Sequence, residues 1–315
     1  MVGFNPNSEF RDTLLTDISE RNLGGVILFG YNVSGPSQLE ILTQELKGYA
    51  ETPLFISIDQ EGGIIARLDE RNGYEETYTA LELGTEFSSE ESTRTQAALM
   101  ADWLKNGGIN MNLAPVVDLN VYPQSPAIGA YEREFSDDPD TVAKHAGWFI
   151  DEFNKENIIN ALKHFPGHGS AREDSHLGFT DITETWADSE LIPYQKLFED
   201  GYSDMVMPGH LFNAELDSTY PATLSHKITT EMLREQLGFK GVVISDGMFM
   251  NAISENYGFF ESVELAINAG VDILLYSANQ YEDLSLVRQI IDYVENRVNE
   301  GSITEASIDS SYARI

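Results

Sequence analysis

The stretch "GVVISDG", residues 241–247, indicates most directly how this chain folds. An apolar run leads straight into the carboxylate of Asp246, which a glycine follows. A strand with one face in water alternates apolar and polar residues, whereas a strand covered on both faces is apolar almost throughout. The stretch therefore predicts a buried strand in a parallel sheet that helices cover.

Short apolar runs of the same kind recur along the chain, and helical patterns separate them. The other seven candidate strands are residues 1–4, 25–29, 54–58, 110–117, 158–162, 204–207 and 271–276. Eight strands with intervening helices favour an α/β fold, a (β/α)₈ TIM barrel, as one domain over residues 1–315. A doubly wound open sheet is the structural alternative. The chain has no G-x-G-x-x-G after its first strand and no G-x-x-x-x-G-K-[ST], which weakens a nucleotide-binding interpretation.

Four helices can be predicted from apolar spacing. Pro36 and Pro139 suit the first turn of two of them, because proline is tolerated there. The apolar stripes, which we interpret as core faces, are Leu39, Leu42 and Leu46; Val142, Ala146, Phe149 and Phe153; Ile228, Met232 and Leu233; and Leu286, Ile290, Ile291, Val294 and Val298.

The charge balance excludes one class of partner. Lys and Arg number 19 and Asp and Glu 52, for a net charge of −33. Such a chain repels nucleic acids and anionic membranes, so we expect neither as a partner. No apolar run is long enough to span a membrane, and no obligate protein partner is evident. The start of the sequence lacks a signal-peptide pattern, which predicts a cytoplasmic protein, or a secreted or periplasmic one if a leader was removed.

Polar residues gather where the predicted strands end. They are Asp59, Lys163, His164, His210 and Asp246. In a parallel barrel the carboxyl ends of all strands share one face, where active sites are built. If the barrel forms, these side chains converge although they lie far apart in the sequence.

Two groups suit acid–base or nucleophilic chemistry. Asp246 can attack an electrophilic carbon, although a helix N-cap is the plainer interpretation. Asp174 and His176 can pair in a loop, where the carboxylate would orient the imidazole for proton transfer. A solvated surface loop is the alternative for that pair.

A metal site is the rival interpretation of the histidines. His164, His168 and His176 are half of the six histidines, and with Asp174 they could bind zinc. Pro166 and Gly167 interrupt regular helical spacing, and no H-E-x-x-H is present.

A further group suits sugar hydroxyls. "DQEGGIIARL", residues 59–68, offers Asp59, Glu61 and Arg67 around two glycines that permit a tight turn. Asp59, at a strand end, suits paired hydrogen bonds to adjacent sugar hydroxyls, and a structural turn with an Asp cap is the alternative. Arg133 lies in another predicted loop, where a weak surface ion pair is the alternative.

In combination, these motifs resemble glycoside hydrolase family 3. "GGVILF", "DQEGG", "LAPVVD", "KHFPGHG" with "DSH", "MVMPGH", "YPATLS" and "LGFKGVVISDGM" occur in the family's order over nearly the whole chain. The set is most similar to the bacterial β-N-acetylglucosaminidase branch. The resemblance implies a (β/α)₈ barrel and a retaining β-N-acetylhexosaminidase that needs no metal or cofactor. Its implied substrate is a small oligosaccharide derived from chitin or from peptidoglycan, and the sequence leaves that choice open.

The resemblance also implies roles for single residues. It makes Asp246 the nucleophile, His176 the acid/base and Asp174 its supporting carboxylate. The implied sugar-binding residues are Asp59, Arg67, Arg133, Lys163 and His164. The sequence departs from the branch at Ile64 and Gly247, where an arginine and a second aspartate are usual, and its loop around Arg133 is longer.

Other functions remain open at this point. Within the family they are a β-N-acetylglucosaminide phosphorylase or a β-glucosidase. Outside it they are a metal-dependent hydrolase built on the histidine cluster and a non-catalytic sugar-binding barrel.

Overall fold

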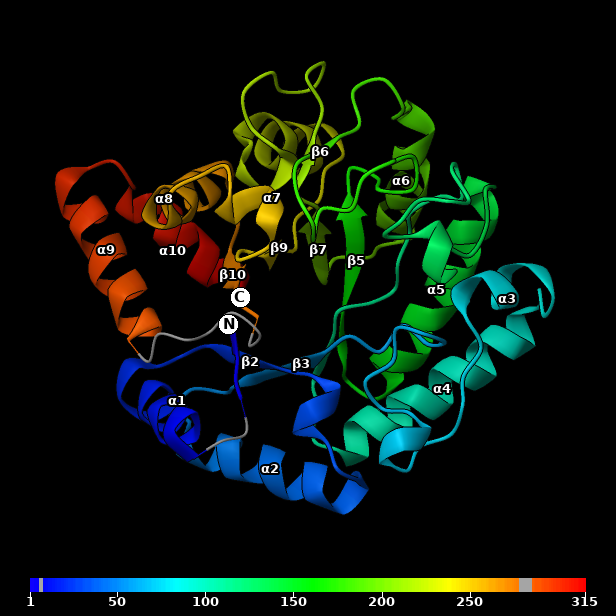
Figure 1. The fold of residues 1–315 in the computed structure, drawn as a ribbon, viewed down its shortest axis with the longest axis horizontal. Coiled ribbons are helices and arrows are strands. Elements are labelled where there is room, and N and C mark those ends of the chain that lie inside the picture. The colour runs from blue at the N-terminus through cyan, green and yellow to red at the C-terminus, as the bar shows by residue number, and fades with distance from the viewer. Residues whose placement is uncertain (6–7, 278–284) are drawn as a thin grey trace.

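The fold was determined as a computed structural model that describes residues 1–5, 8–277 and 285–315. Eight parallel strands form one sheet in the order β1-β2-β3-β4-β5-β7-β9-β10. The sheet closes on itself because Val2 pairs with Tyr276, and the Gly3 N–H donates to the Tyr276 carbonyl at 2.7 Å. Helices surround it (Figure 1). The prediction of a TIM barrel is therefore confirmed.

The strands occupy the predicted places with shifted ends. Their bounds are β1 Val2–Gly3, β2 Gly25–Leu28, β3 Phe55–Ile58, β4 Met111–Asn112, β5 Ile159–Phe165, β7 Met205–Pro208, β9 Val242–Gly247 and β10 Ile273–Leu275. The run 110–117 forms only a two-residue strand, Met111–Asn112, although Val116 further along still bridges Lys163 of β5. β5 and β9 extend further than predicted, so Lys163, His164 and Asp246 lie within strands and not after them. A small sheet of β6 Thr180–Asp181 and β8 Leu211–Phe212 stands outside the barrel.

The helices follow the strands in turn, as the barrel requires. Their bounds are α1 Ser8–Arg21, α2 Pro36–Tyr49, α3 Ala80–Thr85, α4 Glu90–Asn106, α5 Pro139–Lys155, α6 Ile192–Glu199, a π-helical segment Lys227–Gln236, α7 Asn251–Ser254, α8 Phe259–Ala269, α9 Leu286–Glu300 and α10 Glu305–Arg314. All four predicted helices are present, and both prolines stand at the first helical position. Among the described residues, no helix combines the length and the apolar character needed to cross a bilayer.

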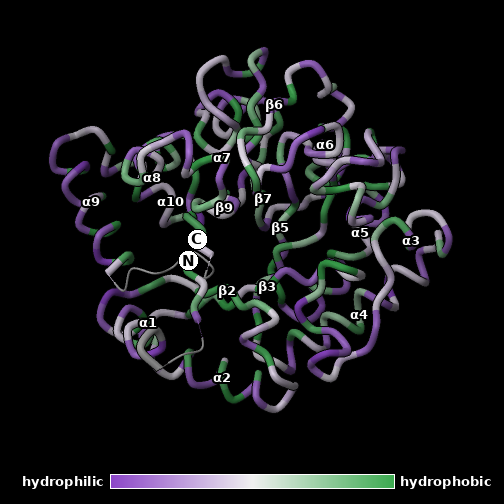
Figure 2. Tube along the Cα trace, in the orientation of Figure 1, coloured by the Kyte–Doolittle hydropathy of each residue, from purple (hydrophilic) through white to green (hydrophobic). Residues whose placement is uncertain are grey.

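Two apolar cores result from the period of two along each strand. Ile27, Ala161, Val242 and Ile244 belong to the core inside the barrel. Their neighbours along the chain, such as Leu28, Leu162 and Val243, pack outward against the helices. In Figure 2 hydrophobic colour accordingly dominates the strands, while the helices alternate between hydrophobic and hydrophilic segments.

The outer core makes one clear prediction for stability. Phe149 of α5 is 1% exposed and stacks on Phe153 with ring centroids 4.6 Å apart. Phe149→Ala should lower the free energy of unfolding by about 3–5 kcal/mol, because it removes buried area and leaves a cavity. Ile41→Ala on α2, where Ile41 is 67% exposed, should change it by less than about 0.5 kcal/mol. Urea unfolding would measure both, and equal losses would contradict this packing.

Candidate active site

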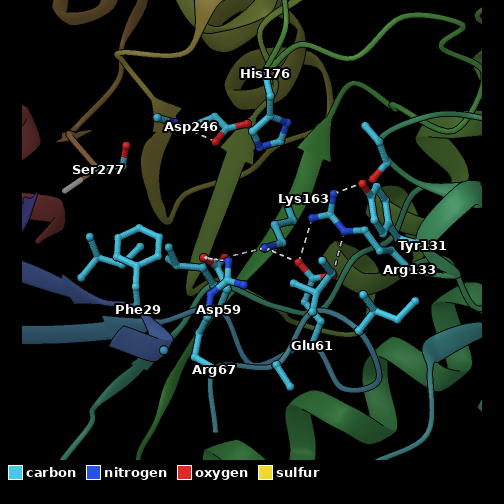
Figure 3. Close-up of a pocket in the computed structure, with 18 of the residues that line it drawn as sticks. Phe29, Asp59, Glu61, Arg67, Tyr131, Arg133, Lys163, His176, Asp246 and Ser277 are labelled. Atoms are coloured by element: carbon cyan, nitrogen blue, oxygen red, sulfur yellow. Dashed lines mark hydrogen bonds and ion pairs between the residues drawn. The ribbon is translucent and has the colours of Figure 1, made fainter. Parts of the chain in front are cut away.

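A pocket of about 860 Å³, here called the main pocket, opens at the carboxyl ends of the barrel strands. The eight residues to which the resemblance gives roles line it: Asp59, Arg67, Arg133, Lys163, His164, Asp174, His176 and Asp246. His210, which was also expected at the strand ends, is buried and bonded to the Gly247 carbonyl. Figure 3 shows that His176 and Asp246 lie on one side of the pocket and that Asp59, Glu61 and Lys163 lie across from them. The expected convergence of sequence-distant residues is therefore observed.

The alternation along the strands explains why three of these side chains point inward. Ala161 belongs to the inner core, and Lys163 is two residues further on. Val242 and Ile244 are also in the inner core, and Asp246 continues that series. Asp59 follows the outward-packed Ile58. Because side chains at i and i+2 share a face, the apolar side chains inside the barrel are followed, toward the carboxyl ends of the strands, by charged ones.

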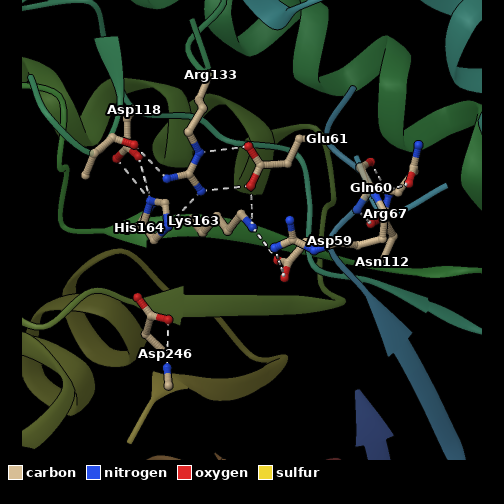
Figure 4. A network of polar contacts seen from close by, with 12 residues as sticks. Asp59, Gln60, Glu61, Arg67, Asn112, Asp118, Arg133, Lys163, His164 and Asp246 are labelled. Atoms are coloured by element: carbon tan, nitrogen blue, oxygen red, sulfur yellow. Dashed lines mark hydrogen bonds and ion pairs between the residues drawn. The ribbon is translucent and has the colours of Figure 1, made fainter. Parts of the chain in front are cut away.

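A buried carboxylate organises the cations of the pocket. Glu61 accepts two hydrogen bonds from the Arg133 guanidinium, at 2.9 and 2.8 Å, and its Oε1 lies 2.6 Å from Lys163 Nζ. Burial by itself raises the pKa of Glu61, but Arg133 and Lys163 outweigh it and lower that pKa to about 2. Arg133 is thus held inside the site, in contrast to the surface ion pair considered above (Figure 4).

Asp59 completes this network. Its two carboxylate oxygens lie 2.9 Å from Lys163 Nζ and 3.2 Å from Arg67 Nη2. Burial raises the pKa of Asp59, but the two cations outweigh it and hold that pKa below its usual range. Burial lowers the pKa of Lys163, and Asp59 and Glu61 reverse that effect and raise it. Gln60 brings Arg67 back to Asp59, because its side-chain oxygen accepts hydrogen bonds from the backbone N–H groups of Arg67 and Leu68.

Asp118 is a site residue that sequence reasoning missed. It is fully buried, its Oδ2 lies 2.8 Å from His164 Nδ1, and its Oδ1 accepts the backbone N–H of His168 at 2.8 Å. Burial raises its pKa, but His164 and the bonds it accepts lower that pKa below the usual range. With Nδ1–H donated to Asp118, His164 Nε2 is an acceptor 3.4 Å from Arg133 Nη2. The signal was the "LAPVVD" motif, where an apolar run again ends in a carboxylate.

The loop that carries His176 is anchored at its base. His168 Nε2 lies 3.2 Å from Ser175 Oγ, and burial lowers the pKa of His168 to about 4. Gly169 packs so closely that an added Cβ would lie 1.7 Å from the Leu119 carbonyl oxygen. The loop is therefore tied to the barrel on the side opposite its exposed end.

At the exposed end, Asp174 and His176 form the predicted pair. Asp174 Oδ1 accepts the backbone N–H of His176 at 2.9 Å and lies 2.8 Å from His176 Nδ1. Burial raises the pKa of Asp174, and the bonds to His176 reverse that effect and lower it. The His176 side chain is 58% exposed, so Nε2 is the ring nitrogen left to exchange a proton with a ligand.

Three imidazoles, those of His164, His176 and His210, act electrostatically on Asp246. Removal from water raises its pKa, but His210, His164, His176 and the Gly247 N–H outweigh this and lower that pKa to about 2. His210 itself is fixed, because its Nε2 donates to the Gly247 carbonyl at 3.0 Å and its Nδ1 lies 2.9 Å from Thr223 Oγ1. Asp246 Oδ1 accepts the Gly247 N–H at 2.7 Å. The N-cap interpretation of Asp246 does not hold, since β9 continues through it to Gly247.

The histidines do not form the arrangement that a metal site needs. His164 is paired with Asp118, His168 with Ser175 and His176 with Asp174. Within the described residues 1–5, 8–277 and 285–315, no three His, Asp or Glu side chains are placed to hold one metal ion together. The geometry gives no support to the metal-dependent alternative.

Comparisons with known proteins find a family model and several named relatives. The model of the "Glycosyl hydrolase family 3 N terminal domain" matches residues 1–315. β-Hexosaminidase A of Pseudoalteromonas piscicida is 32% identical over 95% of this chain and 53% of its own length. β-Hexosaminidase of Tolumonas auensis is 36% identical over 82% of this chain and 76% of its own. The chain thus spans about half of the first relative and three quarters of the second.

Solved structures show the same relationship. A family 3 β-N-acetylglucosaminidase from Paenibacillus sp. str. FPU-7 superposes with a TM-score of 0.90 at 34% identity, over 100% of this chain and 59% of that one. β-N-Acetylhexosaminidase from Beutenbergia cavernae gives a TM-score of 0.89 at 27% identity, over 100% and 94%. With the motifs, the barrel and the family model in agreement, this chain belongs to glycosyl hydrolase family 3.

Proposed function

We propose that this chain is a retaining β-N-acetylhexosaminidase that releases terminal β-linked N-acetylglucosamine from small oligosaccharides. One observation carries the proposal: an ionised carboxylate, Asp246, and an imidazole–carboxylate pair, His176 with Asp174, line one pocket. The family and the β-hexosaminidase names of the relatives support it. A cytoplasmic location, a single domain over residues 1–315 and independence from a protein partner stay predictions.

The first step forms a covalent intermediate. Asp246, which is ionised at neutral pH because its pKa is about 2, attacks the anomeric carbon with one carboxylate oxygen. The bond from that carbon to the leaving oxygen breaks, and protonated His176 gives its Nε2 proton to this oxygen. The aglycone leaves as an alcohol, and the sugar stays as an ester of Asp246.

The second step reverses these roles. Neutral His176 takes a proton from water, and the hydroxide that results attacks the anomeric carbon. The ester bond breaks and returns the electron pair to Asp246. Two inversions at one carbon give net retention of configuration. Asp174 accepts the His176 Nδ1–H throughout, so it fixes the tautomer and stabilises the imidazolium.

The remaining polar residues bind the sugar. Asp59, which already accepts from Lys163 and Arg67, has lone pairs left for neighbouring hydroxyls. The Nε2 acceptor of His164 suits a further hydroxyl, and Lys163 and Arg133 offer N–H donors beside it. Glu61 and Asp118 hold these groups in place, which preorganises the pocket before a ligand arrives.

Substrate preference tests the proposed function directly. We expect turnover of a chromogenic β-N-acetylglucosaminide to exceed that of the matching β-glucoside by at least about tenfold, because a pocket built to bond a polar group discriminates against its absence. A chelator should leave both rates unchanged. Preference for the glucoside would contradict the assigned sugar, and rates lost to the chelator would restore the metal-dependent alternative.

Removal of the nucleophile should abolish turnover and leave the fold intact. Asp246→Ala should lower kcat by at least about 10³-fold, because no other group attacks the anomeric carbon. Azide should restore part of the rate to this variant and give an α-glycosyl azide, which NMR identifies, since the small anion fits the gap on the attacked face.

The control for this variant is Asp200→Ala, because Asp200 is exposed at the end of α6. It should keep the parent rate. A β-configured azide product, or near-parental activity of Asp246→Ala, would refute the assignment of Asp246.

The role of His176 as proton donor can be tested by how the rate depends on the leaving group. His176→Ala should lower the rate on a sugar leaving group by about 10²–10⁴-fold and the rate on dinitrophenolate, which needs no proton, far less. The control is His226→Ala, whose imidazole is exposed at the start of the π-helical segment. An equal loss on both substrates would mean that His176 only shapes the loop.

A further inference from the structure

The charges that line the main pocket cancel. Among the residues that the structure describes, four carboxylates and four cations line it, namely Asp59, Glu61, Asp174 and Asp246 with Arg67, Arg71, Arg133 and Lys163. The field at the pocket therefore comes from the rest of a chain whose net charge is −33. An anionic ligand is repelled on approach, whereas an uncharged one is not.

The cations are already engaged. Lys163 lies between Asp59 and Glu61, and the Arg133 guanidinium makes two bonds to Glu61. Arg67 contacts Asp59, and Arg71 pairs with Asp69. Every cation among the described residues that line the pocket thus contacts a carboxylate, although Lys163 shares Asp59 with Arg67 and Glu61 with Arg133. A ligand carboxylate brought to any of them would meet a like charge within a few ångströms, which destabilises binding.

The outer part of the pocket offers apolar surface. Ile64, Tyr31 and Tyr131 line it and are 58%, 46% and 43% exposed. Ile64 stands at the tip of a tight turn, where Gly62 and Gly63 take φ values of +106° and +54°. Such surfaces suit the C–H faces of a sugar ring, which stack on aromatic and aliphatic side chains.

The Tyr31 ring of this surface is held in place by its neighbours. Tyr31 stacks on Phe29 with ring centroids 5.5 Å apart and an interplanar angle of 15°. The Arg67 guanidinium lies 5.6 Å from the Phe29 ring centroid. Because Arg67 also contacts Asp59, the stack is joined to the sugar-binding residues Asp59, Lys163, His164 and Arg133, here called the polar floor of the pocket. A sugar bound on that floor therefore leaves Ile64, Tyr31 and Tyr131 to the next sugar.

We propose that the site prefers an uncharged aglycone sugar, as in β-1,4-linked N-acetylglucosamine oligomers of the chitin class, over an aglycone that bears a carboxylate. Ile64, Tyr31 and Tyr131 form the surface on which this aglycone rests. The inference rests on the proposed function, since a terminal N-acetylglucosamine must fill the polar floor for the next sugar to reach that surface.

Two disaccharides that differ in one group provide the test. One is N,N′-diacetylchitobiose, and the other has N-acetylmuramic acid in place of the second sugar, which adds a lactyl carboxylate. We expect kcat/KM for chitobiose to be at least about tenfold higher at 10 mM salt, and the ratio to shrink at 0.5 M salt, where the Debye length falls to a few ångströms. The methyl ester of the lactyl group, which keeps the bulk but removes the charge, should recover most of the loss.

A matched pair of variants locates the effect in the pocket. Ile64→Arg should raise kcat/KM for the muramyl disaccharide several-fold, because it places an unpaired cation on the aglycone surface. Ile41→Arg makes the same change in net charge on α2, where Ile41 is exposed outside the main pocket, and should leave both rates unchanged. A change of equal size in both variants would mean that only the overall charge matters and would overturn the role of Ile64.

The outcomes separate this inference from the proposed function. Turnover of an aryl β-N-acetylglucosaminide with equal kcat/KM for the two disaccharides, or with a preference for the muramyl one, would overturn the inference and leave the function standing. No turnover of any N-acetylglucosaminide would overturn both. A methyl ester as poor as the free acid would show that bulk, not charge, decides, and would also overturn the inference.

Discussion

The closure of eight parallel strands is the constraint on which the rest of this structure depends. Once the Val2–Tyr276 pair joins the first strand to the last, every second residue of each strand must point into the barrel. Near the amino ends those positions are apolar and fill the interior, as Ala161 and Val242 do. Near the carboxyl ends the same alternation presents Asp59, Lys163 and Asp246 to one pocket. The site is therefore built on the same inward-facing strand positions as the core, with charged residues in place of apolar ones.

Ion pairing makes such a charged interior tolerable. An isolated charge removed from water costs several kcal/mol, and a pair repays this only when its geometry is good. Glu61 meets this condition, since it receives the Arg133 fork and lies beside Lys163. Each cation is then fixed before a sugar binds, so little reorganisation is needed on binding. The same pairing places a carboxylate against each of these cations, so a ligand carboxylate that approached one of them would also approach a like charge.

The proton donor has a different origin. His176 comes from a loop outside the barrel, and no strand periodicity aims its ring. Its orientation depends on local contacts: Asp174 accepts its Nδ1–H, and the neighbouring Ser175 reaches His168, whose backbone is bonded to the buried Asp118. One aspartate of the barrel wall thus anchors both His164 in the floor and the loop that carries His176.

The sequence by itself determined the class of fold and the identity of the chemical groups. Nearly continuous apolar runs such as 241–245 are typical of strands covered on both faces, and the carboxylates and imidazoles at their ends were visible as motifs. It did not determine how far β5 and β9 extend, because polar residues such as Lys163 and Asp246 carry no strand signal and stay in the ladder only through their neighbours. It also did not identify Asp118, and it did not predict that Glu61 would bind Arg133 and Lys163. Their partners, His164 and Arg133, are 46 and 72 residues away, and only the closed barrel brings those charges within hydrogen-bond distance.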